Sequence, residues 1–185
     1  MKKLVLAFPS FPILETERFI LRQINEKDTD EMFELRSNLE VMKYIPRPLA
    51  ETKNDALNHI NMLLENYQKG EIFCWAITEK SKDILIGNVV FIRIQRENFR
   101  GEIGYILNPK YHGKGIMQEV VNKIVAFGFK TIGFHTIFAI TDPKNMGSRK
   151  VLEKCGFQLE GHFKQNEFYN GKFLDSVYYA KINQT

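Results

Sequence analysis

The amino-acid sequence predicts a mixed α/β (α+β) fold built as a single domain. Three observations predict it: alternating apolar runs typical of strands fill the middle of the chain, four segments have the periodicity of amphipathic helices, and no repeat or linker divides the sequence. Of the 185 residues, 44% are hydrophobic and 26% charged, which is enough for one ordinary core. The expected order is β-α-α-β-β-β-α-β-α-β-β, with an N-terminal arm over residues 1–12 and one domain over residues 13–185.

Composition and charge narrow the classes of protein that the chain could be. The formal net charge is +4, but the two signs are interleaved and no block of five like charges occurs. This balance suits a small phosphorylated ligand as well as nucleic acid, and because no nucleic-acid-binding motif is present we expect no direct nucleic-acid binding. The N-terminal apolar run is shorter than a signal peptide needs, and no run approaches a membrane span, so we expect no membrane association.

The cysteines and histidines indicate a reduced protein without a metal site. Cys74 and Cys155 lie far apart in the chain, and each sits within an apolar pattern, so we expect two core thiols in a cytoplasmic protein. The four histidines are isolated from one another, which argues against a zinc site, and we expect no metal.

The first elements are expected to be a strand and a helix. The segment RFILRQIN, residues 18–25, has a strand pattern, and its arginines, Arg18 and Arg22, are expected to face solvent without a catalytic role. Asp28, followed three residues later by Glu31, resembles a capping box and is expected to open a helix through EMFELRSN.

A second helix and an antiparallel meander are expected to follow. In LAETKNDALNHINMLLENYQKG, Thr52 and Asp55 have the spacing of a capping box, and Gly70 ends the helix. Two short polar connections of hairpin length, KSKD and QRENF, then separate three strand patterns. These strands are expected at residues 71–79, 83–94 and 100–108.

The C-terminal part predicts two more helices and three strands. The helix after Gly115 has two adjacent apolar stripes and is expected to pack on the sheet. These stripes are formed by Ile116, Met117, Val120, Val121, Ile124, Val125, Phe127 and Phe129. The next strand, FHTIFAIT, precedes a helix with Asn145 as its N-cap and Gly156 in a left-handed C-terminal turn. Two strands around the turn YNG close the chain. Three aromatic residues of the strands are expected in the core or an interface: Trp75, Tyr178 and Tyr179.

The turn before the third helix is the first candidate site. In NPKYHGKGIMQE, Pro109, Gly113 and Gly115 stand just ahead of the helix, and no acidic residue occurs between Pro109 and Gln118. Free N–H groups at the positive end of a helix dipole, with Lys114 beside them, are suited to an anion. Two common phosphate-binding motifs, GxGxxG and GxxxxGK[ST], do not match this stretch. From the residues alone, a turn that serves only backbone geometry is therefore as good an interpretation as an anion-binding site.

Two motifs carry a resemblance to a known family. GEIGYILNPKYHGKGIMQEVV resembles the coenzyme A signature of the GNAT superfamily of N-acetyltransferases, and NMGSRKVLEKCGFQLEGHFKQ resembles its second signature. The likeness extends over nearly the whole chain from ETERFILR onward, and the C-terminal half is similar to the RimJ/RimL branch of ribosomal-protein N-terminal acetyltransferases. The resemblance implies a single-domain GNAT-like fold, in which four helices flank a mixed, mostly antiparallel twisted sheet of about seven strands.

The resemblance implies acetyl-CoA (coenzyme A) as the cofactor, with its pyrophosphate at the turn. The family's Q/R-x-x-G-x-G/A pattern falls on residues 112–117, where His112 and Met117 depart from it. Because main-chain N–H groups grip the phosphates, a larger side chain matters only if it blocks the approach, and methionine can bend away. The resemblance also implies that the strand GYILN splays from its neighbour and turns its main chain toward the pantetheine arm of the coenzyme. The implied cofactor-binding residues are Ile106, Leu107, His112, Gly113, Lys114, Gly115, Ile116, Met117, Asn145 and Ser148.

The resemblance also implies two catalytic residues. Many members of the superfamily place a proton-donating tyrosine seven residues after the asparagine of the second signature, where this sequence has Leu152. In the RimJ/RimL branch, the resemblance implies that a serine in the first turn of this helix replaces the tyrosine. That serine is Ser148 here, and it would donate a hydrogen bond to the departing thiolate of coenzyme A. Ten residues after Phe157 of the GF pair, Glu167 matches the general base of that branch. From the residues alone, Ser148 could serve only the helix start and Glu167 could be merely solvated.

The expected function is acetyl-CoA-dependent transfer of an acetyl group to a primary amine, by direct transfer in a ternary complex. The resemblance to the RimJ/RimL branch implies a protein N-terminus, such as that of a ribosomal protein, as the acceptor, and such an amine needs less help from a base than a lysine amine does. Two alternatives stay open: a small-molecule amine such as a polyamine, an antibiotic or an amino acid, or a coenzyme-A-binding sensor that has lost turnover. A homodimer is expected by analogy only.

Overall fold

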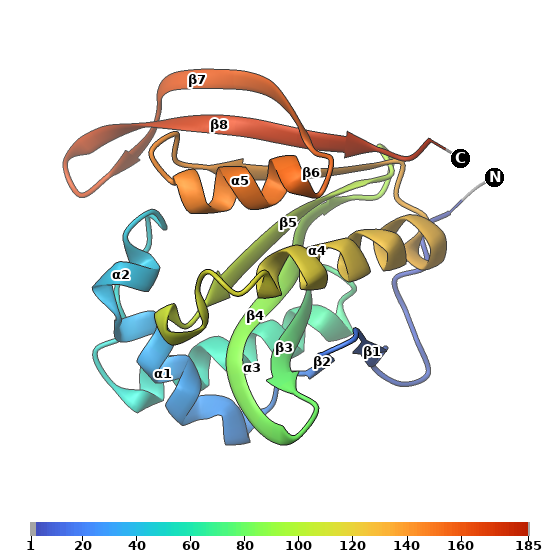
Figure 1. Ribbon diagram of the computed structural model, residues 1–185, viewed down its shortest axis with the longest axis vertical. Coiled ribbons are helices and arrows are strands. Elements are labelled where there is room, and N and C mark those ends of the chain that lie inside the picture. Colours follow the sequence, from blue (N-terminus) through green and yellow to red (C-terminus); the bar gives the residue numbers. More distant parts are fainter. Residues whose placement is uncertain (1–2, 185) are drawn as a thin grey trace.

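An eight-stranded, mostly antiparallel sheet forms the body of the described chain, residues 3–184 of a computed structural model (Figure 1). Its strand order is β1-β2-β3-β4-β5-β6-β8-β7, and within these residues only β5 and β6 pair in parallel. The strands are β1 (Leu14–Glu15), β2 (Phe19–Gln23), β3 (Phe73–Glu79), β4 (Lys82–Gln95), β5 (Arg100–Leu107), β6 (Thr136–Thr141), β7 (Gln158–Tyr169) and β8 (Lys172–Ile182). The α-helices are α1 (Thr29–Ser37), α2 (Leu39–Met42), α3 (Lys53–Gln68), α4 (Ile116–Phe127) and α5 (Met146–Lys154).

The expected order of elements is confirmed, with two short additions. Strand β1 pairs with β2 over two residues, and α2 is a helix of four residues that directly follows α1. A two-residue strand shows no alternation, and a four-residue helix is too short to show a 3.6-residue period. Neither element therefore leaves a pattern that sequence analysis can detect.

One of the two expected capping boxes is confirmed and the other lies one turn earlier than predicted. Thr52 and Asp55 exchange the reciprocal hydrogen bonds of a capping box at the start of α3. Near α1, the box forms between Asn25 and Asp28 and opens a 3₁₀ turn over Glu26–Asp28, so the predicted role of Asp28 as the N-cap partner of Glu31 is wrong. The carboxylate of Asp28 is already engaged by the N–H of Asn25 and by a guanidinium, so it cannot cap α1.

That guanidinium belongs to Arg22, and the prediction that Arg22 faces solvent is wrong. Its side chain is only 15% exposed and donates to both carboxylate oxygens of Asp28, at 2.6 and 2.8 Å, and to Asp83 at 2.5 Å. A buried cation is tolerated when it is paired and hydrogen-bonded. The hydrogen bond to Asp28 raises the pKa of Arg22 although burial opposes it, so Arg22 joins β2 to the turn before α1.

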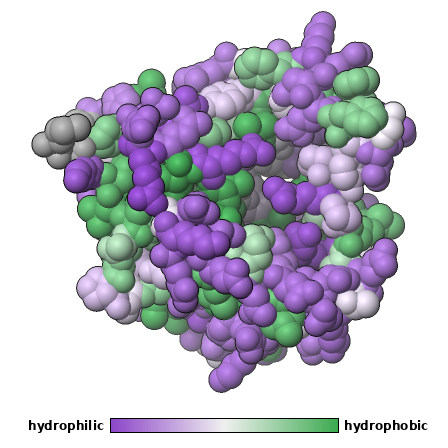
Figure 2. All heavy atoms as spheres, turned by 180° about the vertical axis from the view of Figure 1, so that it is seen from behind, coloured by the Kyte–Doolittle hydropathy of each residue, from purple (hydrophilic) through white to green (hydrophobic). Residues whose placement is uncertain are grey.

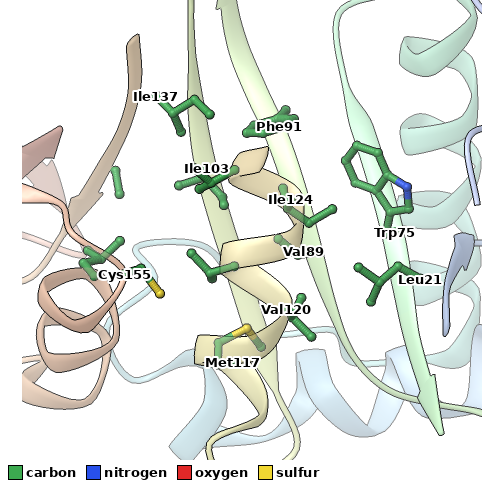
Figure 3. Packing of buried hydrophobic residues seen from close by; sticks show 14 of the residues in the cluster. Leu21, Trp75, Val89, Phe91, Ile103, Met117, Val120, Ile124, Ile137 and Cys155 are labelled. Carbon is green, nitrogen blue, oxygen red and sulfur yellow. The ribbon is translucent and has the colours of Figure 1, made fainter. Parts of the chain in front are cut away.

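The main core lies between α4 and one face of the sheet (Figure 3). Six residues of the two predicted apolar stripes are buried on α4: Ile116, Met117, Val120, Val121, Ile124 and Val125. Trp75 is fully buried, as expected, and its indole N–H donates to the carbonyl of Pro12 in the N-terminal segment. A second cluster packs α1 and α3 on the other face of β3 and β4. Among residues 3–184, no helix is long and apolar enough to span a membrane.

The sheet opens between β5 and β6. The two strands pair over only three registered positions, from Arg100 opposite Thr136 to Glu102 opposite Phe138. Beyond Glu102, β5 continues beside β4 while β6 continues beside β8, and the two strands diverge in Figure 1. The second half of β5 therefore has a backbone edge that β6 does not cover, as the predicted splay requires.

Candidate active site

A large cavity occupies the opening between the two halves of the sheet. Its volume is about 1640 Å³, and its walls come from β5, the turn before α4, the first turn of α5, the segment around α2 and the β7–β8 hairpin. Figure 2 shows a hollow in this face of the molecule, with hydrophilic side chains over much of its rim. The lining residues extend from Arg36 to Ser176, so tertiary structure is needed to bring these segments together.

The turn before α4 presents unpaired amide groups to this cavity. Gly113 and Gly115 have left-handed φ angles of +76° and +71°, which favour glycine, and the first hydrogen bond of α4 runs from the N–H of Glu119 to the carbonyl of Gly115. Within the described residues, the N–H groups of Gly113 to Gln118 donate to no protein acceptor. These six residues all line the cavity. Such a run of amides at the positive end of a helix dipole is suited to phosphate.

His112 differs from the other residues of the turn. Its N–H donates to the carbonyl of Pro109 at 3.0 Å, and its ring Nε2 lies 3.0 Å from the carbonyl oxygen of Leu107. The run of free amides therefore starts one residue later than the sequence pattern suggests, and it extends to Gln118. Met117 is buried in the core, so its long side chain points away from the amides and does not obstruct them.

Arg18 holds the turn from outside and was missed as a site residue. Its guanidinium donates to the carbonyl of Lys114 at 3.1 Å and to Glu119 at 2.7 Å, and its N–H donates to the other oxygen of Glu119. Burial raises the pKa of Glu119, but hydrogen bonds from Thr16 and Arg18 outweigh burial and hold this pKa below its usual value. By binding a carbonyl of the turn, Arg18 fixes the peptide orientation in which the neighbouring amides stay free.

The uncovered edge of β5 is defined by its register with β4. The N–H of Asn108 donates to the carbonyl of Ile86, and Ile106 lies opposite Asn88. Because main-chain groups alternate along a strand, those of Ile106 point toward β4 and those of Leu107 point into the opening. Both residues expected to contact the coenzyme line the cavity, but only Leu107 can offer a main-chain group, and that group is its N–H because its carbonyl oxygen lies 3.0 Å from the ring of His112.

Ser148 lies in the first turn of α5 and meets a tyrosine from the other half of the sheet. Asn145 caps the helix by accepting the N–H of Ser148 at 3.1 Å, which confirms its predicted N-cap role. The hydroxyl oxygen of Ser148 is 3.0 Å from the phenolic oxygen of Tyr105 on β5. Burial raises the pKa of Tyr105 although the hydrogen bond with Ser148 opposes this rise, so the phenol stays protonated near neutral pH. Sequence analysis missed Tyr105 because only tertiary structure reveals its partner.

Glu167 lines the same cavity from β7. A β-bulge between Phe163 and Glu167, with Gln165 at a φ of +52°, changes the register of the strand just before it. A second carboxylate that sequence analysis missed, Glu102 on β5, also lines the cavity and is hydrogen-bonded to Arg93 at 2.8 Å. Burial raises the pKa of Glu102 against the influence of Arg93, and the nearby charge of Glu167 adds to the rise. The cavity therefore contains Ser148, Tyr105 and two carboxylates, all facing one space.

The two cysteines are buried thiols, as predicted. Burial raises the pKa of Cys155 to about 11, and it raises the pKa of Cys74 further. Both side chains are therefore protonated near neutral pH and are poor nucleophiles. The site residues thus support direct transfer better than a covalent cysteine intermediate.

Comparison with known proteins agrees with this geometry. Residues 18–158 match the family model of the acetyltransferase (GNAT) domain. The chain is 35% identical over 172 residues to the uncharacterized N-acetyltransferase YoaA of Bacillus subtilis (strain 168), over 93% of this chain and 97% of that protein. It is 24% identical over 155 residues to the spermidine N(1)-acetyltransferase of Vibrio cholerae serotype O1, over 84% and 87% of the two chains.

Solved structures are similar over nearly the whole chain. An acetyltransferase (GNAT family) from Bacillus anthracis aligns with a TM-score of 0.84 and 31% identity, over 92% of this chain and 98% of that one. The ribosomal-protein-S5-alanine acetyltransferase from Vibrio fischeri aligns with a TM-score of 0.82 and 28% identity, over 94% and 97%. The relatives thus include enzymes named for a protein acceptor and for a polyamine acceptor.

Proposed function

The chain belongs to the GNAT family of acetyltransferases, and we propose that it transfers the acetyl group of acetyl-CoA to the N-terminal amine of a protein, as in the RimJ/RimL branch. One observation carries this proposal: the run of free amides from Gly113 to Gln118 shares a cavity with Ser148 and Glu167. An anion-binding turn, a hydroxyl donor and a carboxylate base are the three parts that such a transfer needs.

The residues of the cavity fit the coenzyme. The amides before α4, with Lys114 beside them, suit a diphosphate, and the uncovered main chain of Leu107 suits the amide groups of a pantetheine arm. Asn145 lies at the other wall, at the start of α5, where it would add a polar contact. When bound, acetyl-CoA supplies a thioester-activated acetyl group. These assignments keep the expected contacts, with main-chain donors from Gly113 onward.

The protein's own groups provide the proton transfers. Glu167 accepts a proton from the acceptor's ammonium group, directly or through water, which leaves the amine neutral and nucleophilic. Ser148 donates a hydrogen bond to the leaving sulfur, Tyr105 orients the Ser148 hydroxyl, and the proton that the attacking nitrogen loses reaches the sulfur through water. At pH 7 the deprotonation of an N-terminal amine costs about 1 kcal/mol, and that of a lysine amine about 4.6 kcal/mol. A single carboxylate base is therefore adequate for an N-terminal amine.

A small-molecule amine is the second candidate acceptor. It is favoured by the similarity to a spermidine N(1)-acetyltransferase, which is comparable in identity to the match with ribosomal-protein relatives. A coenzyme-A-binding sensor without turnover is disfavoured because the donor pair of Tyr105 and Ser148 and the carboxylate of Glu167 are all present in one cavity.

Coenzyme A release separates these functions. The protein is incubated with acetyl-CoA and a panel of peptides with free N-termini, the same peptides with blocked N-termini and internal lysines, and polyamines. We expect release only with the free N-termini. Release with polyamines but not with peptides would replace the proposed acceptor, and binding of acetyl-CoA without release on any acceptor would favour the sensor.

A further inference from the structure

Two arginines in the cavity have no acidic partner. Arg36 lies in the last turn of α1 and Arg47 lies in the loop after α2, and both line the cavity. Neither side chain forms an ion pair or donates a hydrogen bond within residues 3–184. The other arginines all have a hydrogen-bond acceptor or an aromatic ring beside the guanidinium: Arg18, Arg22, Arg93, Arg96, Arg100 and Arg149.

The chain fold brings these two cations near each other. The N–H of Ala50 donates to the carbonyl of Arg36 at 3.1 Å, which folds the loop that carries Arg47 back onto the end of α1. Burial and the neighbouring charge of Arg47 lower the pKa of Arg36. Burial, Arg36 and Arg47 lower the pKa of His59, on α3, to about 4, so His59 is neutral near neutral pH. Arg36 is partly buried and Arg47 is exposed, and neither guanidinium has a protein anion beside it in the described part of the chain, so an anionic group of a ligand can bind both.

The same cavity has carboxylates next to these cations. Glu102 lies close enough to both Glu167 and Arg47 for each charge to influence its pKa. Arg93 already pairs with Glu102, so Glu102 does not neutralise Arg47 through an ion pair. Glu167 and Glu102 therefore lie in one part of the wall and Arg47 and Arg36 in another, although Glu40 and Lys43 of the α2 segment also line the cavity. A ligand that matches this wall has a cationic amine at one end and an anionic group at the other.

We infer that the acceptor carries an anionic group, a carboxylate or a phosphate, which Arg36 and Arg47 bind while the acceptor amine faces Glu167. This inference rests on the proposed function and narrows its acceptor to amines with a nearby negative charge. In a protein N-terminus, an acidic or phosphorylated side chain within the first few residues meets the requirement. A polyamine does not, because its second cation would face two guanidiniums.

Matched peptides test this inference. Their N-terminal alanine is followed by Asp or Asn, by Glu or Gln, or by phosphoserine or serine, so each pair differs in charge with little change in size. We expect kcat/KM at least about tenfold higher for the anionic member, as one charge-assisted hydrogen bond provides. The carboxylate pairs and the phosphate pair distinguish the two sources of the anion. Equal rates within every pair would overturn the inference.

Variants locate the effect. In Arg36→Gln and Arg47→Gln we expect the preference to fall to about twofold or less, through a higher KM for the anionic peptide. The rate with the neutral peptide should fall much less than the rate with the anionic peptide, and the KM for acetyl-CoA should not change. Lys27→Gln removes an exposed cation outside the cavity and is the control. Arg36→Lys keeps the charge and should retain more of the preference for the anionic peptide than Arg36→Gln does. Because Arg47 is exposed, its variant stays informative if Arg36→Gln unfolds. A weaker affinity for acetyl-CoA instead would assign the arginines to the coenzyme and overturn the inference.

A binding measurement is independent of turnover. Calorimetry with N-acetylated peptide pairs in the presence of coenzyme A should show the same preference, and the anionic peptide should raise the pKa of His59 in NMR titrations. Turnover of peptides without any charge preference would refute this inference and leave the proposed function in place. Turnover of small zwitterionic amines but not of peptides would refute the proposed protein acceptor and leave the inference in place.

Discussion

The phenolic oxygen of Tyr105 lies 3.0 Å from the hydroxyl oxygen of Ser148, and the two residues come from opposite sides of the opening in the sheet. The main-chain carbonyl of Ser148 lies 3.3 Å from the same phenolic oxygen, so the single phenol proton has two acceptors, and the proposed role of Ser148 requires that it goes to the hydroxyl oxygen. A tyrosine on β5 therefore supports the serine of α5, and Leu152 of the same helix has no hydroxyl that could do so. The position of the donor hydroxyl is set by tertiary contact between the two halves.

Loss of the Tyr105 hydroxyl should lower turnover through Ser148. We expect Tyr105→Phe to reduce kcat about tenfold, and Ser148→Ala to reduce it further, with little change in the KM for acetyl-CoA. The double variant should resemble Ser148→Ala, because the two residues act as one unit. Tyr178→Phe is the control, since its buried hydroxyl has no hydrogen-bond partner within residues 3–184. Additive effects of the two substitutions would refute the coupling.

Removal of the proposed base should affect turnover in a pH-dependent way. We expect Glu167→Gln to lower kcat by about a hundredfold or more, with the largest loss at low pH, where the free amine is scarce. Glu160→Gln changes an exposed carboxylate on the same strand that does not line the cavity, and it should retain activity. Equal pH profiles for the Glu167 variant and the wild type would refute the assignment.

Arg18 should influence coenzyme binding without contacting the acceptor. Since it binds the carbonyl of Lys114 and holds the turn, we expect Arg18→Gln to weaken coenzyme A binding about fivefold to tenfold by calorimetry, with kcat at saturation nearly unchanged. Arg18→Lys keeps the charge but not the planar fork, so it should restore only part of the affinity. Lys80→Gln, which removes an exposed pair with Glu15, is the control. Full affinity in Arg18→Gln would exclude a positioning role.

The stability that Glu119 contributes should depend on pH. The folded-state pKa of Glu119 is lowered, so its contribution is present above the unfolded pKa of about 4.3 and is lost as the pH falls through the folded pKa. The difference in Tm between the wild type and Glu119→Gln should therefore be largest at about pH 7 and should shrink as the pH falls below the unfolded pKa. A difference that is constant over this range would mean that the ionised carboxylate is not the cause.

Arg22 should be important for stability and not for chemistry. Its removal leaves the carboxylate of Asp28, which is 3% exposed, without its main partner, so we expect Arg22→Ala to lower the free energy of unfolding by about 3–5 kcal/mol. Lys53→Ala removes the exposed pair with Asp30 and should cost less than about 1 kcal/mol. Denaturant titration measures both values, and equal losses would show that burial of the Arg22 pair has no special role.

The sequence predicted those parts of the fold that depend on local patterns. Thr52 with Asp55, Asn145 as an N-cap and Gly156 in a left-handed turn are local signals, and all three are confirmed. The apolar stripes of α4 likewise predicted its buried face. These features need only neighbouring residues, so a single sequence contains them.

The missed features involve residues that are distant in the sequence. Arg22 was expected in solvent because its carboxylate partners, Asp28 and Asp83, cannot be assigned from an alternating strand pattern. Tyr105 and Glu102 looked like ordinary strand residues, and only the opening beside β6 makes them part of a cavity. The resemblance to a family located the turn and the expected catalytic positions, while the roles of Ser148 and Glu167 remain predictions for the experiments above.

The short pairing of β5 with β6 joins the two halves of the sheet at one end only, from Arg100 to Glu102. The angle between the two strands at this junction therefore determines how far apart they lie at the cavity. Gly101 lies at this end, and a methyl group added to it would come within 2.8 Å of the ring of Phe134. A larger residue at position 101 must therefore displace Phe134, which lies just before β6, and would change the width of the cavity although it is remote from any reacting group.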